Sequence, residues 1–91
     1  MTKIEVLSRA AELVSGDREL QYGDSTQNLK TLAELWRSLI GIDLESAQVA
    51  LMLAALKLMR LAHDHTHTDS WVDLAGYAAI GAEACEGIEN E

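Results

Sequence analysis

The densest group of side chains that could do chemistry lies between residues 63 and 69. This group consists of His63, Asp64, His65, His67 and Asp69. Imidazole and carboxylate groups can bind a transition metal, and histidine can also titrate near neutral pH. A zinc site, however, normally uses three or four ligands in a fixed geometry, and no cysteine pair accompanies these residues. The pattern therefore favours a solvated turn between two helices, with a metal site or a substrate-facing histidine as alternatives.

Two carboxylates follow at a spacing that places them on one helix face. Asp69 and Asp73 are four residues apart, so both can project from the first turns of a helix that begins at or before Asp69. Such a pair can hold Mg²⁺, with water and the phosphates of a nucleotide completing the coordination. The alternative is that Asp69 caps the helix and Asp73 only interacts with the positive end of its dipole.

Two cations lie three residues apart on the preceding, most apolar segment. Because Lys57 and Arg60 stand among apolar residues, each needs water or an anionic partner. They can contact a phosphate, Arg60 as a fork and Lys57 as a point charge. Otherwise they can reach the surface or pair with Asp64, Asp73 or Glu83.

The elements that would position these groups are helices. The chain lacks proline and is rich in alanine, leucine and glutamate, which favour helix. Capping signals and apolar spacing predict an all-α fold with four helices, at about 3–15, 25–40, 44–63 and 70–86. The predicted N-caps are Thr2, Asp24, Asp43 and either Asp69 or Ser70.

The third predicted helix carries more apolar surface than its own chain can cover. Nearly every residue from Val49 to Met59 is apolar, which predicts a central helix and a dimer or higher homo-oligomer. In the fourth helix Gly76 and Gly81 each cost about 1 kcal/mol relative to alanine. We therefore expect tight contact between these glycines and a neighbouring helix or a ligand.

Length and charge restrict the class of protein. The 91 residues predict one domain, residues 1–91, with a frayed acidic tail from about residue 87. The net charge of −8 argues against binding to duplex nucleic acid. A single cysteine, Cys85, and the absence of a secretory signal or an apolar run of membrane-spanning length predict a cytoplasmic protein with no membrane association.

Two segments carry a resemblance to known families. They are RELQYGDSTQNLKTLAELW, at residues 18–36, and KLMRLAHDHTHTDSWVDLAGYAAIGAE, at residues 57–83. Together they resemble a family of small phage and prophage proteins of unknown function. They are similar, more distantly, to MazG-like nucleotide pyrophosphohydrolases and to phage nucleotide-modification-associated domains. The matching residues are Tyr22, Gly23, Asp24 and Asn28, then Lys57, Arg60, Asp69, Trp71, Asp73, Gly76 and Tyr77.

This resemblance implies an oligomeric MazG-like helical bundle, located in the host cytoplasm if phage-encoded, that binds a nucleotide or a nucleotide-derived ligand. Lys57 and Arg60 would contact phosphate. MazG-like enzymes hold Mg²⁺ with Glu-x-x-Glu and Glu-x-x-Asp pairs, whereas this chain has Glu45 followed by Gln48. Hydrolysis of a phosphoanhydride would therefore depend on Mg²⁺ at Asp69 and Asp73.

The base would be contacted by Tyr22, Asn28 or Trp71, and this requires the two segments to meet at one cleft. Two other functions remain open. An acidic phage-encoded interaction module could inhibit a host defence protein, or the chain could be a structural oligomer without a ligand.

Overall fold

A computed structural model describes residues 1–16, 21 and 23–89. Its helices are α1 (Lys3–Leu13), α3 (Ser25–Ile40), α4 (Ser46–His63) and α5 (Thr68–Glu89). The described part of the chain contains no strand, so the prediction of an all-helical protein with four helices is confirmed.

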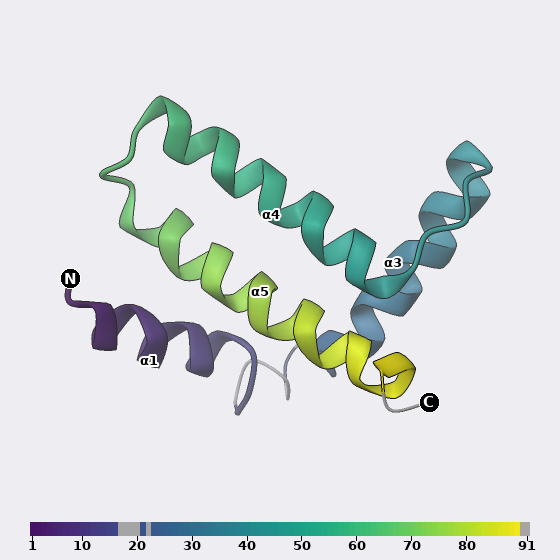
Figure 1. Ribbon diagram of the computed structural model, residues 1–91, viewed down its shortest axis with the longest axis horizontal. Helices are drawn as coiled ribbons and strands as arrows, with labels where there is room; N and C mark the ends of the chain where they lie inside the picture. Colours follow the sequence, from purple (N-terminus) through teal and green to yellow (C-terminus); the bar gives the residue numbers. More distant parts are fainter. Residues whose placement is uncertain (17–20, 22, 90–91) are drawn as a thin grey trace.

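The long helix α5 lies in the middle of the molecule and contacts each of the other three helices. Helices α4 and α5 form an antiparallel hairpin, α1 lies along the other side of α5, and α3 crosses the far end of the hairpin (Figure 1). Side chains on different faces of α5 therefore meet different neighbours.

Local signals fix the first two helices as predicted. The Thr2 hydroxyl accepts the backbone N–H of Glu5, and the Glu5 carboxylate accepts the backbone N–H of Thr2 in return, which completes a capping box. Asp24 caps α3 by accepting the backbone N–H of Thr26 at 2.9 Å. Gly41 ends α3 in the left-handed region, with φ 71°, which a residue with a side chain seldom adopts.

The starts of the last two helices differ from the prediction. Helix α4 begins at Ser46 with Glu45 as its N-cap, whereas Asp43 forms an ion pair with Arg37 at 2.7 Å. The prediction of Asp43 as the cap was therefore wrong, because the cation on the last turn of α3 engages its carboxylate.

Helix α5 begins at Thr68, two residues before the predicted start. Ser70 consequently lies inside the first turn with a fully buried side chain, and Asp69 is already helical. Neither residue precedes the helix, so neither is the N-cap.

Small residues bring α4 and α5 close together. Val49 and Ala50 of α4 are buried against α3 and α5, in a cluster with Leu29 and Ala33. A Cβ placed on Gly81 would come within 3.0 Å of the Ala50 Cβ, which is tighter than ordinary contact. The predicted close approach at Gly81 is therefore present.

In the described part of the chain, no helix has both the length and the hydropathy needed to cross a lipid bilayer.

Candidate ligand pocket

A pocket of about 260 Å³ lies where α3 meets α5, with the end of α1 and the middle of α4 beside it. Leu29, Leu32, Leu53 and Ile80 contribute apolar surface, and Ser25, Asn28, Asp73 and Tyr77 contribute polar groups. This combination of apolar area with a few polar groups is typical of small-molecule sites.

The N-terminus of α3 supplies one side of the pocket. Gly23 has φ 83°, which turns the chain into the Asp24 cap, and the first helical turn then directs Ser25 and Asn28 to the pocket. The polar segment before α3 thus reaches the site through a turn and a capped helix start.

Helix α5 supplies the opposite side. Asp73, Gly76, Tyr77 and Ile80 recur at spacings of three and four residues and line the pocket from one helix face. A Cβ on Gly76 would lie 3.5 Å from a methyl group of Val14, which is ordinary van der Waals distance.

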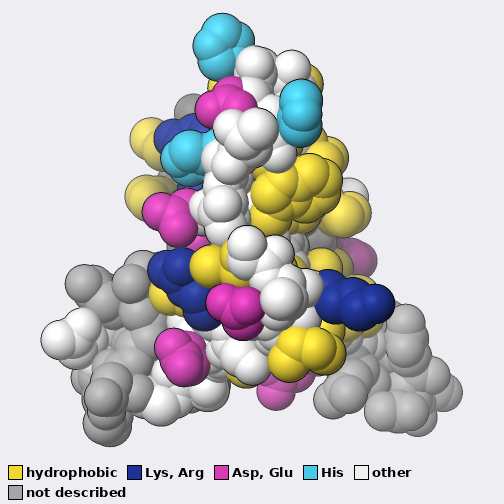
Figure 2. Space-filling view, turned by 90° about the vertical axis from the view of Figure 1, so that its left-hand side faces the viewer, with side chains coloured by type: hydrophobic (Ala, Val, Ile, Leu, Met, Phe, Trp, Pro, Cys, Tyr) yellow, Lys and Arg dark blue, Asp and Glu magenta, His cyan; other side chains and the backbone are white. Residues whose placement is uncertain are grey.

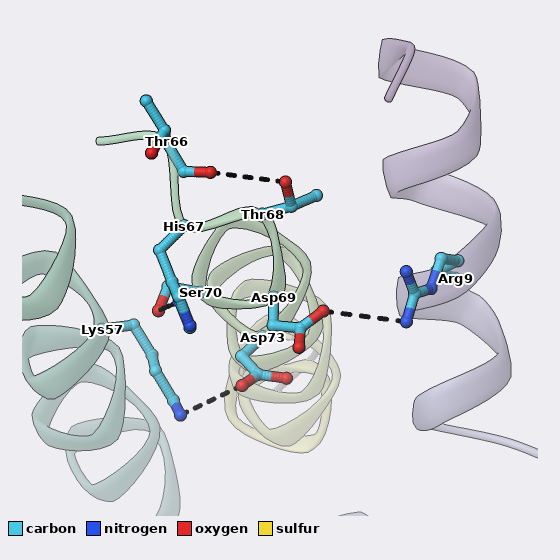
Figure 3. Close-up of polar contacts among 8 residues, drawn as sticks. All are labelled: Arg9, Lys57, Thr66, His67, Thr68, Asp69, Ser70 and Asp73. Atoms are coloured by element: carbon cyan, nitrogen blue, oxygen red, sulfur yellow. Dashed lines mark hydrogen bonds and ion pairs between the residues drawn. The ribbon is translucent and has the colours of Figure 1, made fainter. Parts of the chain in front are cut away.

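Asp73 carries the charge of the pocket and is paired with Lys57. The Lys57 Nζ lies 3.0 Å from Asp73 Oδ2, with the two side chains 12% and 34% exposed. The lysine extends from α4 across to α5, so its ammonium group stands beside the pocket lining (Figure 3). Of the three partners predicted for Lys57, the structure selects Asp73.

Asp69, one turn earlier on α5, faces a different cation. Its Oδ1 lies 3.7 Å from an Arg9 guanidinium nitrogen on α1, and the Asp69 side chain is 70% exposed. Figure 3 shows Asp69 turned towards α1 and Asp73 towards α4. Within the described residues no three His, Cys, Asp or Glu side chains are grouped as metal ligands. Magnesium at Asp69 and Asp73 remains a prediction.

The histidines lie at the opposite end of the α4–α5 hairpin from the α3 crossing. They gather at one end of the molecule (Figure 2), where Met59, Arg60, His63, Asp64 and His67 line an open depression of about 560 Å³. The depression is separate from the ligand pocket because the two share no lining residue. Arg60 therefore does not line the pocket that contains Asp73.

The turn that carries the histidines is held by its own side chains. Asp64 accepts hydrogen bonds from the Thr66 hydroxyl at 2.6 Å and from the Thr66 backbone N–H at 3.0 Å. The hydroxyl bond, followed by the backbone bond, lowers the pKa of Asp64 below its ordinary value. The interhelical turn is thus an ordered structure.

Two further hydrogen bonds fix the start of α5. The buried Ser70 hydroxyl lies 2.7 Å from His67 Nδ1, and the Trp71 indole N–H donates to the His65 carbonyl at 2.9 Å. Trp71 is partly exposed and does not line the ligand pocket.

The predicted nucleotide-binding residues therefore divide into three groups. Asn28 lines the pocket, and Lys57 reaches it through Asp73. Arg60 and Trp71 lie outside the lining, and Tyr22 lies outside the described residues.

Sequence reasoning did not assign Ser25, Leu53, Tyr77 or Ile80 to the site. The helical spacing of Tyr77 and Ile80 from Asp73 was the available signal.

Comparison with known proteins places the sequence among phage proteins. A family model described as "Domain of unknown function (DUF6378)" matches residues 5–85. The Gene 55 protein of Mycobacterium phage L5 is 35% identical over 78 residues, which cover 85% of this chain and 50% of the relative. The Gene 55 protein of Mycobacterium phage D29 is 32% identical over 73 residues, covering 80% and 48%. The chain thus spans about half the length of these curated relatives. No solved structure matches it at a significant level.

Proposed function

The chain belongs to the DUF6378 family of phage proteins, and from the lining of its pocket we propose that it binds a nucleotide or a nucleotide-derived small molecule between α3 and α5. One observation carries the proposal. Gly23 and Asn28, from the first polar segment, line the same pocket as Asp73, Gly76 and Tyr77 from the second. Segments that are distant along the chain supply one cavity with polar groups set among apolar ones.

The lining suits a planar heteroaromatic base. Leu29, Leu53 and Ile80 provide apolar surface for the faces of the ring, and the Tyr77 ring can stack on it. The Asn28 amide carries both donors and an acceptor for the edge of a base. Asp73 adds a carboxylate acceptor.

The size of the pocket limits what enters it. A volume of about 260 Å³ lies just below the range of about 300–1,000 Å³ typical of drug-sized ligands. The base would therefore occupy the pocket while the phosphates extend outward. Lys57, which is paired with Asp73 of the lining, would contact these phosphates, and Arg60 lies one turn further along α4.

Magnesium belongs to the proposal as an ion that arrives with the phosphates. Asp69 and Asp73 would supply its carboxylate oxygens, and Mg²⁺ would retain several waters. Such an ion must compete with Arg9 for Asp69 and with Lys57 for Asp73. A MazG-like hydrolysis of the phosphoanhydride would follow only if the ion displaces both cations.

Isothermal titration of a panel of nucleosides and nucleotides, with and without Mg²⁺, tests the proposal. Asp73→Asn changes the pocket carboxylate, and Asp69→Asn is the matched control on the same helix outside the pocket lining. We expect Asp73→Asn to weaken nucleoside binding at least tenfold and Asp69→Asn to leave it unchanged.

Comparing the two variants with nucleotide and Mg²⁺ then tests the metal. If both carboxylates hold the ion, each variant loses the Mg²⁺-dependent part of nucleotide affinity. No heat from any ligand with the folded wild-type protein would overturn the proposed function.

A further inference from the structure

The outer face of α4 is apolar and has no helix packed against it in the described structure. α4 borders α5 on one side, and its opposite side faces outward (Figure 1). Leu51, Leu58 and Met59 are 70%, 54% and 62% exposed. Monomeric proteins rarely expose a large contiguous apolar patch, because covering it removes apolar surface from water.

The spacing on this face is that of a helix-pairing seam. Leu51, Ala55, Leu58 and Ala62 are all exposed and follow one another at intervals of four, three and four residues. Alternating intervals of three and four residues define the seam of a coiled coil. The eighteen residues of α4 give a helix about 27 Å long, so the seam extends over several turns.

We propose that a second copy of the chain covers this face, with the two α4 helices antiparallel around a two-fold axis that passes between positions 55 and 58. In this register Leu51 lies opposite the partner's Ala62, and Ala55 lies opposite the partner's Leu58. Each large side chain then meets a small one, as close packing requires. A parallel pair would instead place each alanine opposite another alanine and leave gaps along the seam.

The distribution of charge agrees with self-association. The sequence carries a net charge of −8, but α4, residues 46–63, contains no Asp or Glu. Two copies can therefore meet along this stretch without burying a carboxylate. Antiparallel packing also sets the two helix dipoles in opposite directions, which is the favourable arrangement.

Pairing of α4 with α4 favours a closed dimer over an open chain of subunits. Helix α1, on the other side of α5, also exposes Ile4 and Leu7. Contact between α1 of one copy and α4 of another would be heterologous and would leave free faces at both ends. The α4 seam pairs with itself and closes the assembly.

Analytical ultracentrifugation without added nucleotide tests the dimer independently of ligand binding. We expect the wild-type chain of 9.9 kDa to sediment as a dimer at micromolar protein concentrations. Leu51→Glu and Leu58→Glu each place two carboxylates in the interface and should raise the dissociation constant at least about a hundredfold. Leu7→Glu is the matched control, since Leu7 is 60% exposed on α1.

Circular dichroism checks that all three variants remain helical, which we expect because the substituted side chains are exposed. A monomeric wild-type protein would overturn the proposal. Loss of the dimer in Leu7→Glu with retention in Leu51→Glu and Leu58→Glu would do the same.

Cross-linking tests the orientation. In a Cys85→Ser background, a mixture of Leu51→Cys and Ala62→Cys proteins should cross-link efficiently with a short bis-maleimide, because these positions face each other across the antiparallel seam. Each variant alone should cross-link poorly. Efficient cross-linking of each variant alone, with no gain in the mixture, would indicate a parallel pair and refute the proposed register.

Discussion

The ion pair between Lys57 and Asp73 should be the most informative polar contact to perturb. Its two atoms are 3.0 Å apart, and the side chains are 12% and 34% exposed. At effective dielectric constants of about 20 to 80, two unit charges at this separation attract by about 1.4–5.5 kcal/mol before desolvation is subtracted. Removing one partner of a fully buried pair costs about 3–5 kcal/mol, whereas exposed pairs contribute about 0–1 kcal/mol.

Because the two side chains are unequally exposed, we expect the two single substitutions to lower the free energy of unfolding by different amounts. Asp73→Asn leaves the nearly buried Lys57 ammonium without its counter-ion, so we expect a loss of about 1.5–3 kcal/mol in the free energy of unfolding. Lys57→Met keeps the apolar stem and leaves Asp73 partly hydrated, so we expect a loss of about 0.5–1.5 kcal/mol. The double variant should lose less free energy of unfolding than the sum of the two single losses.

Urea unfolding of the four proteins, followed by circular dichroism at one fixed protein concentration without ligand, measures the double-mutant cycle. We expect a coupling of about 1–2 kcal/mol. A coupling below about 0.5 kcal/mol would describe a solvent-screened surface pair and contradict the expected strength. A smaller loss for Asp73→Asn than for Lys57→Met would contradict the inference that the less exposed Lys57 ammonium depends more on its partner.

Three further predictions concern packing and the interhelical turn. Gly76→Ala should raise the free energy of unfolding by up to about 1 kcal/mol through helix propensity. Gly81→Ala should give no gain or a loss in stability, because its Cβ would lie 3.0 Å from a neighbouring Cβ. Paired thermal melts compare the two variants. Ser70→Ala removes a buried hydrogen bond at 2.7 Å and should lower stability by about 1 kcal/mol in urea unfolding, and an unchanged value would contradict that bond. The pKa of Asp64 is lowered from 3.8, so the stabilising effect of its carboxylate is complete above that value and is lost as the pH falls through the folded-state pKa. Thr66→Val should raise the pKa of Asp64 in an NMR titration. A constant pKa would exclude the Thr66 hydroxyl as the cause.

The presence of the helices could be predicted from the sequence because the residues that begin and end a helix act locally. The Thr2 capping box, the Asp24 cap and the left-handed Gly41 each act within one turn of the residue that carries them. The two wrong caps involve contacts that a capping pattern does not encode. Asp43 pairs with Arg37 of the preceding helix, and Ser70 is buried inside the first turn of α5.

The pocket could be predicted only in part, because four separate segments line it. Asn28 was predicted to contact a base, yet nothing in its local sequence indicates that it shares a cavity with Tyr77. Lys57 shows the same limit. Asp64, Asp73 and Glu83 were all predicted as possible partners, and the packing of α4 against α5 brings Asp73 to it. Glu83 instead accepts a hydrogen bond from the Thr26 hydroxyl of α3 at 3.4 Å.

Asp69 and Asp73 show that a spacing of four residues on one helix does not give two carboxylates the same ion-pair partner. With 3.6 residues per turn, a step of four residues advances about 40° beyond a full turn. On a surface helix this rotation matters little. On α5, which lies between α1 and α4, it separates a carboxylate that meets Arg9 from one that meets Lys57. A ligand or cation that binds Asp73 therefore acts first on the α4 side of the molecule, while the contact between α1 and Asp69 can persist. The two carboxylates are thus neighbours on one face of α5 but contact different helices, because α5 lies between those helices.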